Sequence, residues 1–490
     1  MLFNSFIYFF FLITVLGFFY LVKNSGSRKA VLLIASYSFY AYWDYRFSAL
    51  LVFVTISGFY ISSAISLSRD RRSGKILYFL AIVANLTVLF FFRYFNFFAD
   101  NINSVFSAFG THNDLIHMRL IIPLGVSFYI FQSISYVTDV YKGRFIHEKS
   151  LTNYALYIAF FPKLIAGPIE RAKDLMPQFI EVKKAKRVEL EQGISLIAIG
   201  LFRKVLIGDT AGRFADHIFG NMEYYASSEL IFALFMYSIQ IYADFSGYTH
   251  IARGTGKLFG IDLVKNFEQP YLAKNMTDFW RRWHISLSSW LRDYLFLPLS
   301  YGISDKLKRE RYFGIKSEYI IYIYATMITF TLCGLWHGAS WNFVIWGFLH
   351  GVFLCLHRVL FAGKRSPAGR YMRKLPKKIR TVSGVVFTYL CVAFLWLFFR
   401  LPEMSSNKEF FTGLSNWIQS DHFGLFLSVS AVYMLVLLLA DTLEIKTCSH
   451  DILSGIKNNS VRYGIISGLF FVIFLFMYQS DSSPFIYLQF

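Results

Sequence analysis

The sequence predicts an all-α protein, a polytopic bundle of transmembrane helices. Hydrophobic residues make up 56% of the 490-residue chain and charged residues 16%, whereas a soluble domain carries about 25% charged residues. Apolar stretches close to about 20 residues, the length of one bilayer crossing, recur from one end of the chain to the other. This repetition, more than any one segment, predicts a membrane protein and argues against a water-soluble fold.

The apolar stretches predict about eleven to thirteen crossings within one transmembrane domain that covers residues 1–490. The first stretch is interpreted as a retained span, because no basic residue precedes it and no small-residue cleavage pattern follows it. The stretch at 152–167 runs into FPKLIAGPIER, whose prolines and glycine predict a broken, re-entrant helix. The predicted spans are residues 3–22, 30–43, 48–67, 76–97, 120–140, 152–167, 192–207, 229–247, 319–337, 341–358, 382–399, 424–441 and 462–479.

The net charge of +19 comes from 49 Lys and Arg residues against 30 Asp and Glu residues. The excess cations gather in short loops between apolar stretches, such as 69–75, 306–316 and 358–380. Short basic loops stay in the cytoplasm, so segments 99–117 and 209–229, which carry few cations, are expected on the outer side. A nucleic-acid binder would instead collect its charge on a soluble face, and none is predicted here.

Four scattered cysteines lack any C-x-x-C spacing, so neither a disulfide framework nor a metal site is predicted. The region at about 248–318 is the longest predicted non-spanning stretch. From Trp280 to Tyr294 its apolar residues fall at helical spacing on one face, with Arg281, Arg282 and other polar residues opposite. Two interpretations remain open for this amphipathic helix: it lies in the membrane interface, or it is cytoplasmic and packs against the bundle.

His337 is the most informative ionisable residue in the sequence. It ends an apolar stretch that enters from a basic loop, and the next stretch leads back to another basic loop, so His337 lies far from both. An ionisable group at such a depth faces the bundle interior or a wet cavity by default. A buried imidazole favours its neutral form, which can accept a proton from a hydroxyl. Taken alone, such a histidine is more often structural.

The motif around His337 favours a catalytic role over a structural one. Five blocks in the same order are similar to the membrane-bound O-acyltransferase family over nearly the whole chain, and within it to the branch that O-acetylates bacterial alginate, an exopolysaccharide, and peptidoglycan. The blocks are IPLGVSFYIFQSISYVTDVY, FPKLIAGPIER, QIYADFSGYTHIARG, NFEQPYLAKNMTDFWRRWHISLSSWLRDYLFLPL and GLWHGASWNFVIWGFLHG.

This resemblance implies a helical bundle around a central channel in the bacterial inner membrane. It implies that His337 is the catalytic base and that the second family histidine, His284, positions the donor or supports the site. Arg281 and Arg282 could attract an anionic donor such as a coenzyme A phosphate, although positive-inside anchoring is the favoured explanation for them. We expect the channel to be lined by Trp336, Asn342, Asp244 and Ser246, with an ion pair between Asp244 and Arg253 as the alternative for the carboxylate.

The expected reaction is acyl transfer across the bilayer, with acetyl-coenzyme A as donor and no tightly bound cofactor. The expected acceptor is a polysaccharide hydroxyl, or the hydroxyl of a periplasmic acetyltransferase partner that relays the acetyl group. Within the family, D-alanyl transfer to teichoic acid is the alternative. Outside it, a polysaccharide or lipid transporter would also need many spans and interrupted helices, but its internal repeat is not visible.

Overall fold

The computed structural model describes residues 1–110, 118, 120–361, 374–401, 403–415, 417–479 and 484–486. Regular structure in these ranges is almost entirely helical, and strands β1 (Arg311–Tyr312) and β2 (Ile315–Lys316) form one short antiparallel hairpin. The predicted all-α fold is confirmed. The chain divides into two compact units: unit 1 contains residues 1–206, 244–264 and 444–490, and unit 2 contains 207–243 and 265–443.

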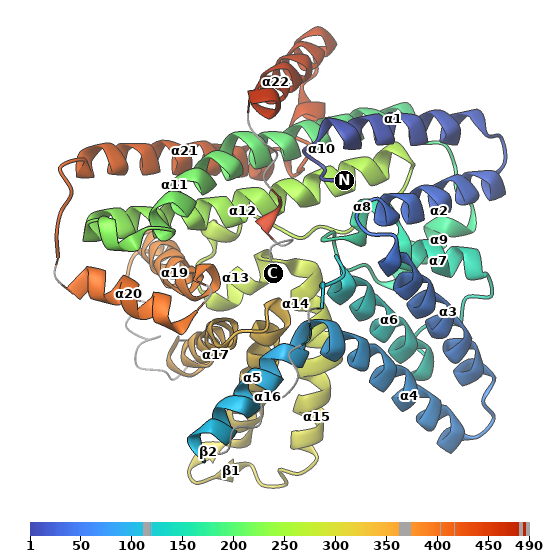
Figure 1. The fold of residues 1–490 in the computed structure, drawn as a ribbon, viewed down its shortest axis with the longest axis horizontal. Coiled ribbons are helices and arrows are strands. Elements are labelled where there is room, and N and C mark those ends of the chain that lie inside the picture. Colours follow the sequence, from blue (N-terminus) through green and yellow to red (C-terminus); the bar gives the residue numbers. More distant parts are fainter. Residues whose placement is uncertain are drawn as a thin grey trace. The chain divides into compact units, whose positions relative to one another are not determined.

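Unit 1 is built largely from the N-terminal half of the chain, coloured blue to green in Figure 1. In it, α3 and α4 pack against each other and against α6, and α2 packs on α7. The first turns of α2, α4 and α7 are capped by the side chains of Asn24, Asp70 and Ser150, which accept backbone N–H groups that have no helical partner. The elements of unit 1 are α1 (Phe6–Leu21), α2 (Ser25–Ala41), α3 (Arg46–Leu67), α4 (Arg71–Leu89), η1 (Phe90–Tyr94), α5 (Phe95–Ala108), α6 (Val126–Tyr141), α7 (Leu151–Ala159), α8 (Phe161–Leu164), α9 (Ala172–Ile180), α10 (Arg187–Leu201), η7 (Leu453–Gly455) and α22 (Asn459–Gln479).

Unit 2 carries the motif around His337, on the helical hairpin formed by α16 and α17 (Figure 1). Helix α19 packs on α17, and α15 packs on α16. The elements of unit 2 are α11 (Asp209–Phe219), η3 (Met222–Tyr224), η4 (Pro270–Leu272), α13 (Met276–Arg282), α14 (Ile285–Leu291), η5 (Arg292–Phe296), α15 (Leu297–Ser304), β1, β2, α16 (Ser317–His337), α17 (Trp341–Leu356), η6 (His357–Phe361), α19 (Lys377–Arg400) and α20 (Met404–Ser415). Three elements contribute residues to both units: η2 (Phe202–Gly208), α12 (Ser227–Leu258) and α21 (Phe423–Thr447).

Within the described ranges, eight helical segments are long and apolar enough to cross a membrane, so the chain is a multi-pass membrane protein. They match eight of the predicted spans. Four other predicted spans correspond to α1, α2, α6 and α10. Helices α1, α2 and α6 have 16 to 17 residues each and are short for a crossing of about 20 residues, whereas α10 continues through η2 into α11. The eight segments are Arg46–Leu67, Arg71–Ala108, Ser227–Leu258, Ser317–His337, Trp341–Phe361, Lys377–Arg400, Phe423–Thr447 and Asn459–Tyr478.

The remaining predicted span, 152–167, is broken as its prolines and glycine indicated. Helix α7 ends at Ala159, and the short α8 occupies only Phe161–Leu164. The segment is buried in unit 1, where the ammonium of Lys163 donates to Oε1 of Gln132 at 2.7 Å and to the carbonyl of Ile158 at 3.2 Å. Protein therefore covers this non-helical backbone, as a membrane environment requires.

The continuous amphipathic helix predicted from Trp280 to Tyr294 is wrong. The helix stops after Arg282 and restarts at Ile285, because His284 has a left-handed backbone with φ of 43°. Trp283 and Leu287, on the predicted apolar face, are buried in protein, which agrees with the packed interpretation for this part of the segment. The start of the predicted 248–318 region is also helical, because α12 continues to Leu258.

Candidate active site

The hairpin of α16 and α17 positions His337 at the last residue of α16. Two glycines allow the helices to cross at very short range: a Cβ on Gly334 would lie 2.1 Å from the carbonyl oxygen of Phe343, and one on Gly347 would lie 2.1 Å from that of Phe330. Both obstacles are backbone atoms, which cannot rotate away as a side chain can. The glycines therefore set the separation of the two helices and, with it, the surroundings of His337.

Aromatic rings enclose the imidazole of His337. The ring centroids of Trp336, Trp346 and Phe399 lie 4.8, 5.0 and 5.1 Å from that of His337, all in edge-to-face orientations. Phe399 comes from α19, and only 4% of His337 is exposed. The ring is thus held in a dry setting, where electrostatic interactions with a reacting group are stronger than in water.

His284 lies in the sharp turn between α13 and α14, and Asn266, in the segment before α13, holds this turn. The carbonyl of Asn266 accepts the N–H of Ile285 at 2.9 Å, and its side-chain oxygen accepts the hydroxyl of Ser286 at 2.6 Å. A left-handed conformation in a non-glycine residue costs free energy and persists where surrounding structure enforces it. Asn266 supplies that enforcement from a position 18 residues earlier in the chain.

Burial defines the charge state of His284. Its side chain is fully buried, and desolvation lowers the pKa of His284 to about 3. The imidazole is therefore neutral at physiological pH and does not act as a cation toward an anionic substrate.

Trp336 connects the two histidines of the predicted site. Its ring centroid lies 6.3 Å from that of His284 and 4.8 Å from that of His337. Residues 284 and 337 thus meet in one aromatic cluster although they are 53 positions apart in the sequence. Of the predicted site residues, His337, His284 and Trp336 are brought together.

Two further residues belong to this cluster and were not singled out from the sequence. His350 lies with its ring centroid 4.6 Å from that of Trp346, and its Nδ1 accepts the indole N–H of Trp280 at 3.2 Å. Trp346 and His350 are one helical turn apart on α17, a spacing that puts both on the same side of the helix, where both contact Trp280 of α13. That spacing was the available signal.

Asn342, predicted to line a channel, is fully buried and bonded to backbone. Its amide donates to the carbonyls of Leu401 at 2.7 Å and Glu403 at 3.0 Å, and its oxygen accepts the amide of Asn407 at 2.6 Å. Asn342 therefore fixes the start of α17 against the loop after α19. Gly338, which follows His337, lies against the ring of Phe343, which a Cβ at Gly338 would meet at 2.2 Å.

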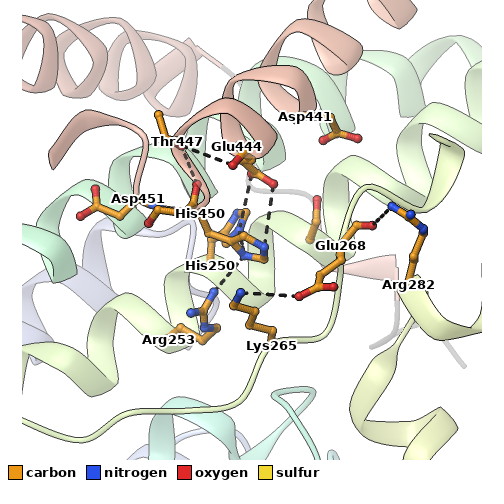
Figure 2. A network of polar contacts seen from close by, with 12 residues as sticks. His250, Arg253, Lys265, Glu268, Arg282, Asp441, Glu444, Thr447, His450 and Asp451 are labelled. Atoms are coloured by element: carbon orange, nitrogen blue, oxygen red, sulfur yellow. Dashed lines mark hydrogen bonds and ion pairs between the residues drawn. The ribbon is translucent and has the colours of Figure 1, made fainter. Parts of the chain in front are cut away.

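Arg281 and Arg282 lie at the end of α13, just before the His284 turn. Arg281 is exposed. Arg282 is partly buried, and its guanidinium donates to Asp278 at 2.9 Å. It also donates to the carbonyl of Glu268 at 3.2 Å (Figure 2). Arg282 thus holds the turn locally, whereas Arg281 has its charge at the surface. The described residues include no group of three or more His, Cys, Asp or Glu side chains arranged to hold a metal ion.

Asp244 and Ser246 lie in unit 1 within a buried polar network. Asp244 forms an ion pair of 2.5 Å with Lys204 and accepts the backbone N–H of Ile486 at 2.6 Å, so its partner is Lys204 and not the alternative considered, Arg253. Ser246 accepts a hydrogen bond of 3.3 Å from Arg203.

The same network continues through Glu444, which Arg203 contacts at 2.7 Å. In Figure 2, His250 and His450 point toward each other and toward Glu444. Nε2 of His250 lies 3.1 Å from Nδ1 of His450, and Arg253 donates to the same Nδ1 at 3.0 Å. These contacts join the second half of α12 to the end of α21 within unit 1.

Comparison with known proteins identifies the family. The sequence pattern of the membrane-bound O-acyltransferase family matches residues 142–401, more than half of the chain. The chain belongs to this family. It is accordingly an O-acyltransferase of the membrane, and its histidine cluster in unit 2 lies inside the matched region. The alternative of a transporter is not retained.

Individual relatives cover most of this O-acyltransferase. It is 36% identical to the probable alginate O-acetylase AlgI of Azotobacter vinelandii over 86% of this chain and 80% of the relative. It is 33% identical to the peptidoglycan O-acetyltransferase of Helicobacter pylori over 84% of this chain and 80% of that protein. A teichoic acid D-alanyltransferase of Bacillus subtilis is 28% identical over 56% of this chain and 68% of the relative.

Proposed function

We propose that the protein transfers an acetyl group from acetyl-coenzyme A, on the cytoplasmic side, to a hydroxyl group outside the bacterial inner membrane. The acceptor is a sugar hydroxyl of a polysaccharide such as alginate or peptidoglycan, or the hydroxyl of a periplasmic relay partner. The long matches to an alginate O-acetylase and a peptidoglycan O-acetyltransferase support this choice of acyl group and acceptor class.

One observation carries the mechanistic part: a single imidazole, His337, ends a membrane-spanning helix inside a ring of aromatic side chains. In the proposed step a ring nitrogen of His337 takes the proton of the acceptor hydroxyl while the oxygen attacks the thioester carbonyl. The new C–O bond forms, the C–S bond breaks, and the proton passes from the imidazole to the departing thiolate. An ester and a free thiol result.

In this proposal His284 is a positioning residue. Its neutral, buried ring packs beside Trp336, so it supports the aromatic enclosure of His337. Arg281, exposed next to the His284 turn, is the candidate for attracting a phosphate of the donor, because guanidinium binds phosphate well. Arg282 is a weaker candidate, since its guanidinium is already engaged by Asp278 and Glu268.

The test is replacement of His337 by Ala, with membrane levels verified, followed by measurement of ester-linked acetate on the cell-surface polymer. We expect loss of about 10²- to 10⁴-fold, the usual contribution of a positioned general base. His422→Gln is the control, because His422 is exposed and lies outside this cluster, and acetylation should be unchanged in this variant. Acetylation that persists in His337→Ala at normal protein levels contradicts the catalytic assignment.

The shorter matches to two teichoic acid D-alanyltransferases support D-alanine as an alternative acyl group. The two reactions differ in donor, since D-alanyl transfer uses a thioester on a carrier protein. Purified protein in lipid nanodiscs, given acetyl-coenzyme A and a soluble sugar acceptor, is expected to release free coenzyme A thiol. Release only with an acylated carrier protein would favour the alternative.

A further inference from the structure

Unit 2 contains a cavity of about 670 Å³ between α11, the start of α12 and the start of α21. Its volume is in the range of small-ligand sites, about 300–1,000 Å³. Helix α11 lines it with one stripe of residues spaced by three or four positions. The lining residues are Thr210, Arg213, Phe214, His217, Ile218, Tyr225, Phe232, Phe426 and Tyr433.

The apolar part of the cavity is a continuous series of aromatic rings. Phe232 and Phe426 have centroids 4.7 Å apart, Phe214 lies 5.7 Å from Phe232, and Tyr433 lies 6.4 Å from Phe214. The series joins three helices, so the wall is built by tertiary packing and is not one exposed face.

The polar part of the cavity is cationic. Arg213 and His217 are exposed, and the ring of His217 lies 6.0 Å from that of Tyr225. The nearby carboxylate of Asp216 is engaged by Arg400 at 2.8 Å. Arg213 therefore presents its positive charge, with a histidine and a phenol nearby as hydrogen-bonding groups.

The cavity lies near the end of two membrane-spanning helices. Phe232 and Phe426 belong to the first two turns of α12 and α21, both of which are long and apolar enough to cross the membrane. Hydrogen bonds from the N–H groups of Ile418 and Ser420 to the hydroxyls of Ser227 and Ser228 tie these two helix starts together. Only 11% of the apolar part of α21 is buried, so a lipid can reach the cavity along this helix.

We propose that this cavity binds a phospholipid with an anionic headgroup. The phosphate lies against Arg213 and His217, and the upper part of an acyl chain packs on Phe232 and Phe426. Charge complementarity and the combination of a cationic mouth with an aromatic interior support a lipid. A partner helix would need a longer face, because the lining covers only about two turns of α21.

The binding site is tested with the purified full-length protein in nanodiscs of phosphatidylcholine that contain a minor fraction of phosphatidylglycerol. Phosphatidylglycerol with a photoreactive acyl chain is cross-linked, and labelled peptides are mapped by mass spectrometry. We expect label in residues 210–233 and 423–436. Arg213→Gln should lower the yield about fivefold, the effect of one cation near a lipid phosphate, whereas Arg213→Lys should retain most of it.

Arg46→Gln is the matched control, because Arg46 is exposed but already paired with Asp44 at 2.6 Å. Its labelling should equal that of the unmodified protein. Equal labelling of Arg213→Gln, label spread evenly along α21, or equal yield and equal Arg213 dependence with photoreactive phosphatidylcholine overturns the proposal. A polypeptide cross-linked to these segments in place of lipid also overturns it. The outcome is independent of acyl transfer, since Arg213 is outside the proposed catalytic cluster.

Discussion

Replacing Gly347 by Ala should displace α16 from α17 and thereby disturb the surroundings of His337. The added Cβ would lie 2.1 Å from the carbonyl oxygen of Phe330, whereas ordinary contact begins at 3.4 Å. The helices must therefore separate by about 1.3 Å, the difference between these distances. The atoms that the new Cβ would meet belong to the backbone of Phe330 and Gly334, so no side chain can rotate to relieve the strain.

The displacement acts on catalysis more than on folding. Overpacking of a buried contact costs about 1–3 kcal/mol in the free energy of unfolding. A misplacement of about 1 Å in a catalytic group lowers the rate by about a hundredfold. We expect Gly347→Ala to fold with a lowered melting temperature and to lose about a hundredfold in ester-linked acetate formation.

Gly351→Ala is the control on the same helix, one turn further along. There a Cβ would lie 3.1 Å from Sδ of Met327, a flexible side chain that can move, so activity should be nearly unchanged. Wild-type activity in Gly347→Ala would refute the reasoning. An equal loss in Gly351→Ala would also refute it, because the effect would then not depend on the backbone contact.

Three further predictions concern buried polar groups. Asn266→Ala removes the acceptor of Ser286 beside the His284 turn and should cost about 1–3 kcal/mol in the free energy of unfolding. Thermal denaturation measures the loss, and an unchanged melting temperature would contradict this prediction. Glu444→Gln leaves the fully buried Arg203 without its charge partner and should destabilise unit 1 by about 3–5 kcal/mol, which an unchanged melting temperature would contradict. Burial lowers the pKa of His284 to about 3, whereas a histidine in the unfolded chain titrates at about 6.5. Between these pH values the unfolded state binds more protons, so the free energy of unfolding should fall as the pH drops from about 6.5. His284→Gln should make this fall less steep, and equal pH dependence in both proteins would contradict the prediction.

The membrane fold was predictable because hydropathy reports on long apolar helices. All eight long apolar segments coincide with predicted spans, including Ser227–Leu258, of whose apolar part 83% is buried in protein. Helix α6 is mostly buried inside unit 1 and shorter than a crossing, yet its apolar residues give the same signal. Hydropathy therefore does not distinguish burial in protein from burial in lipid.

Site residues were predictable where a local sequence motif contains them. They were not predictable where contacts between residues distant in the sequence determine the structure. His337 and His284 stood out through their motifs. The break at His284 has no glycine or proline to announce it, and the helical spacing of the surrounding residues favoured continuity. Asn266 enforces the break from a distant position, which periodicity cannot reveal. Asp244 likewise met Lys204 and not Arg253, since only the packing of α12 selects between two cations.

The aromatic enclosure of His337 has a consequence for fidelity. A thioester held beside a base is open to attack by any small nucleophile, and water is the most abundant one. Rings from three helices leave the imidazole almost no contact with solvent, so hydrolysis of the donor should be slow unless an alcohol is present. Opening one side of this enclosure, for example with Phe399→Ala, should convert part of the acyl transfer into wasteful release of the acid.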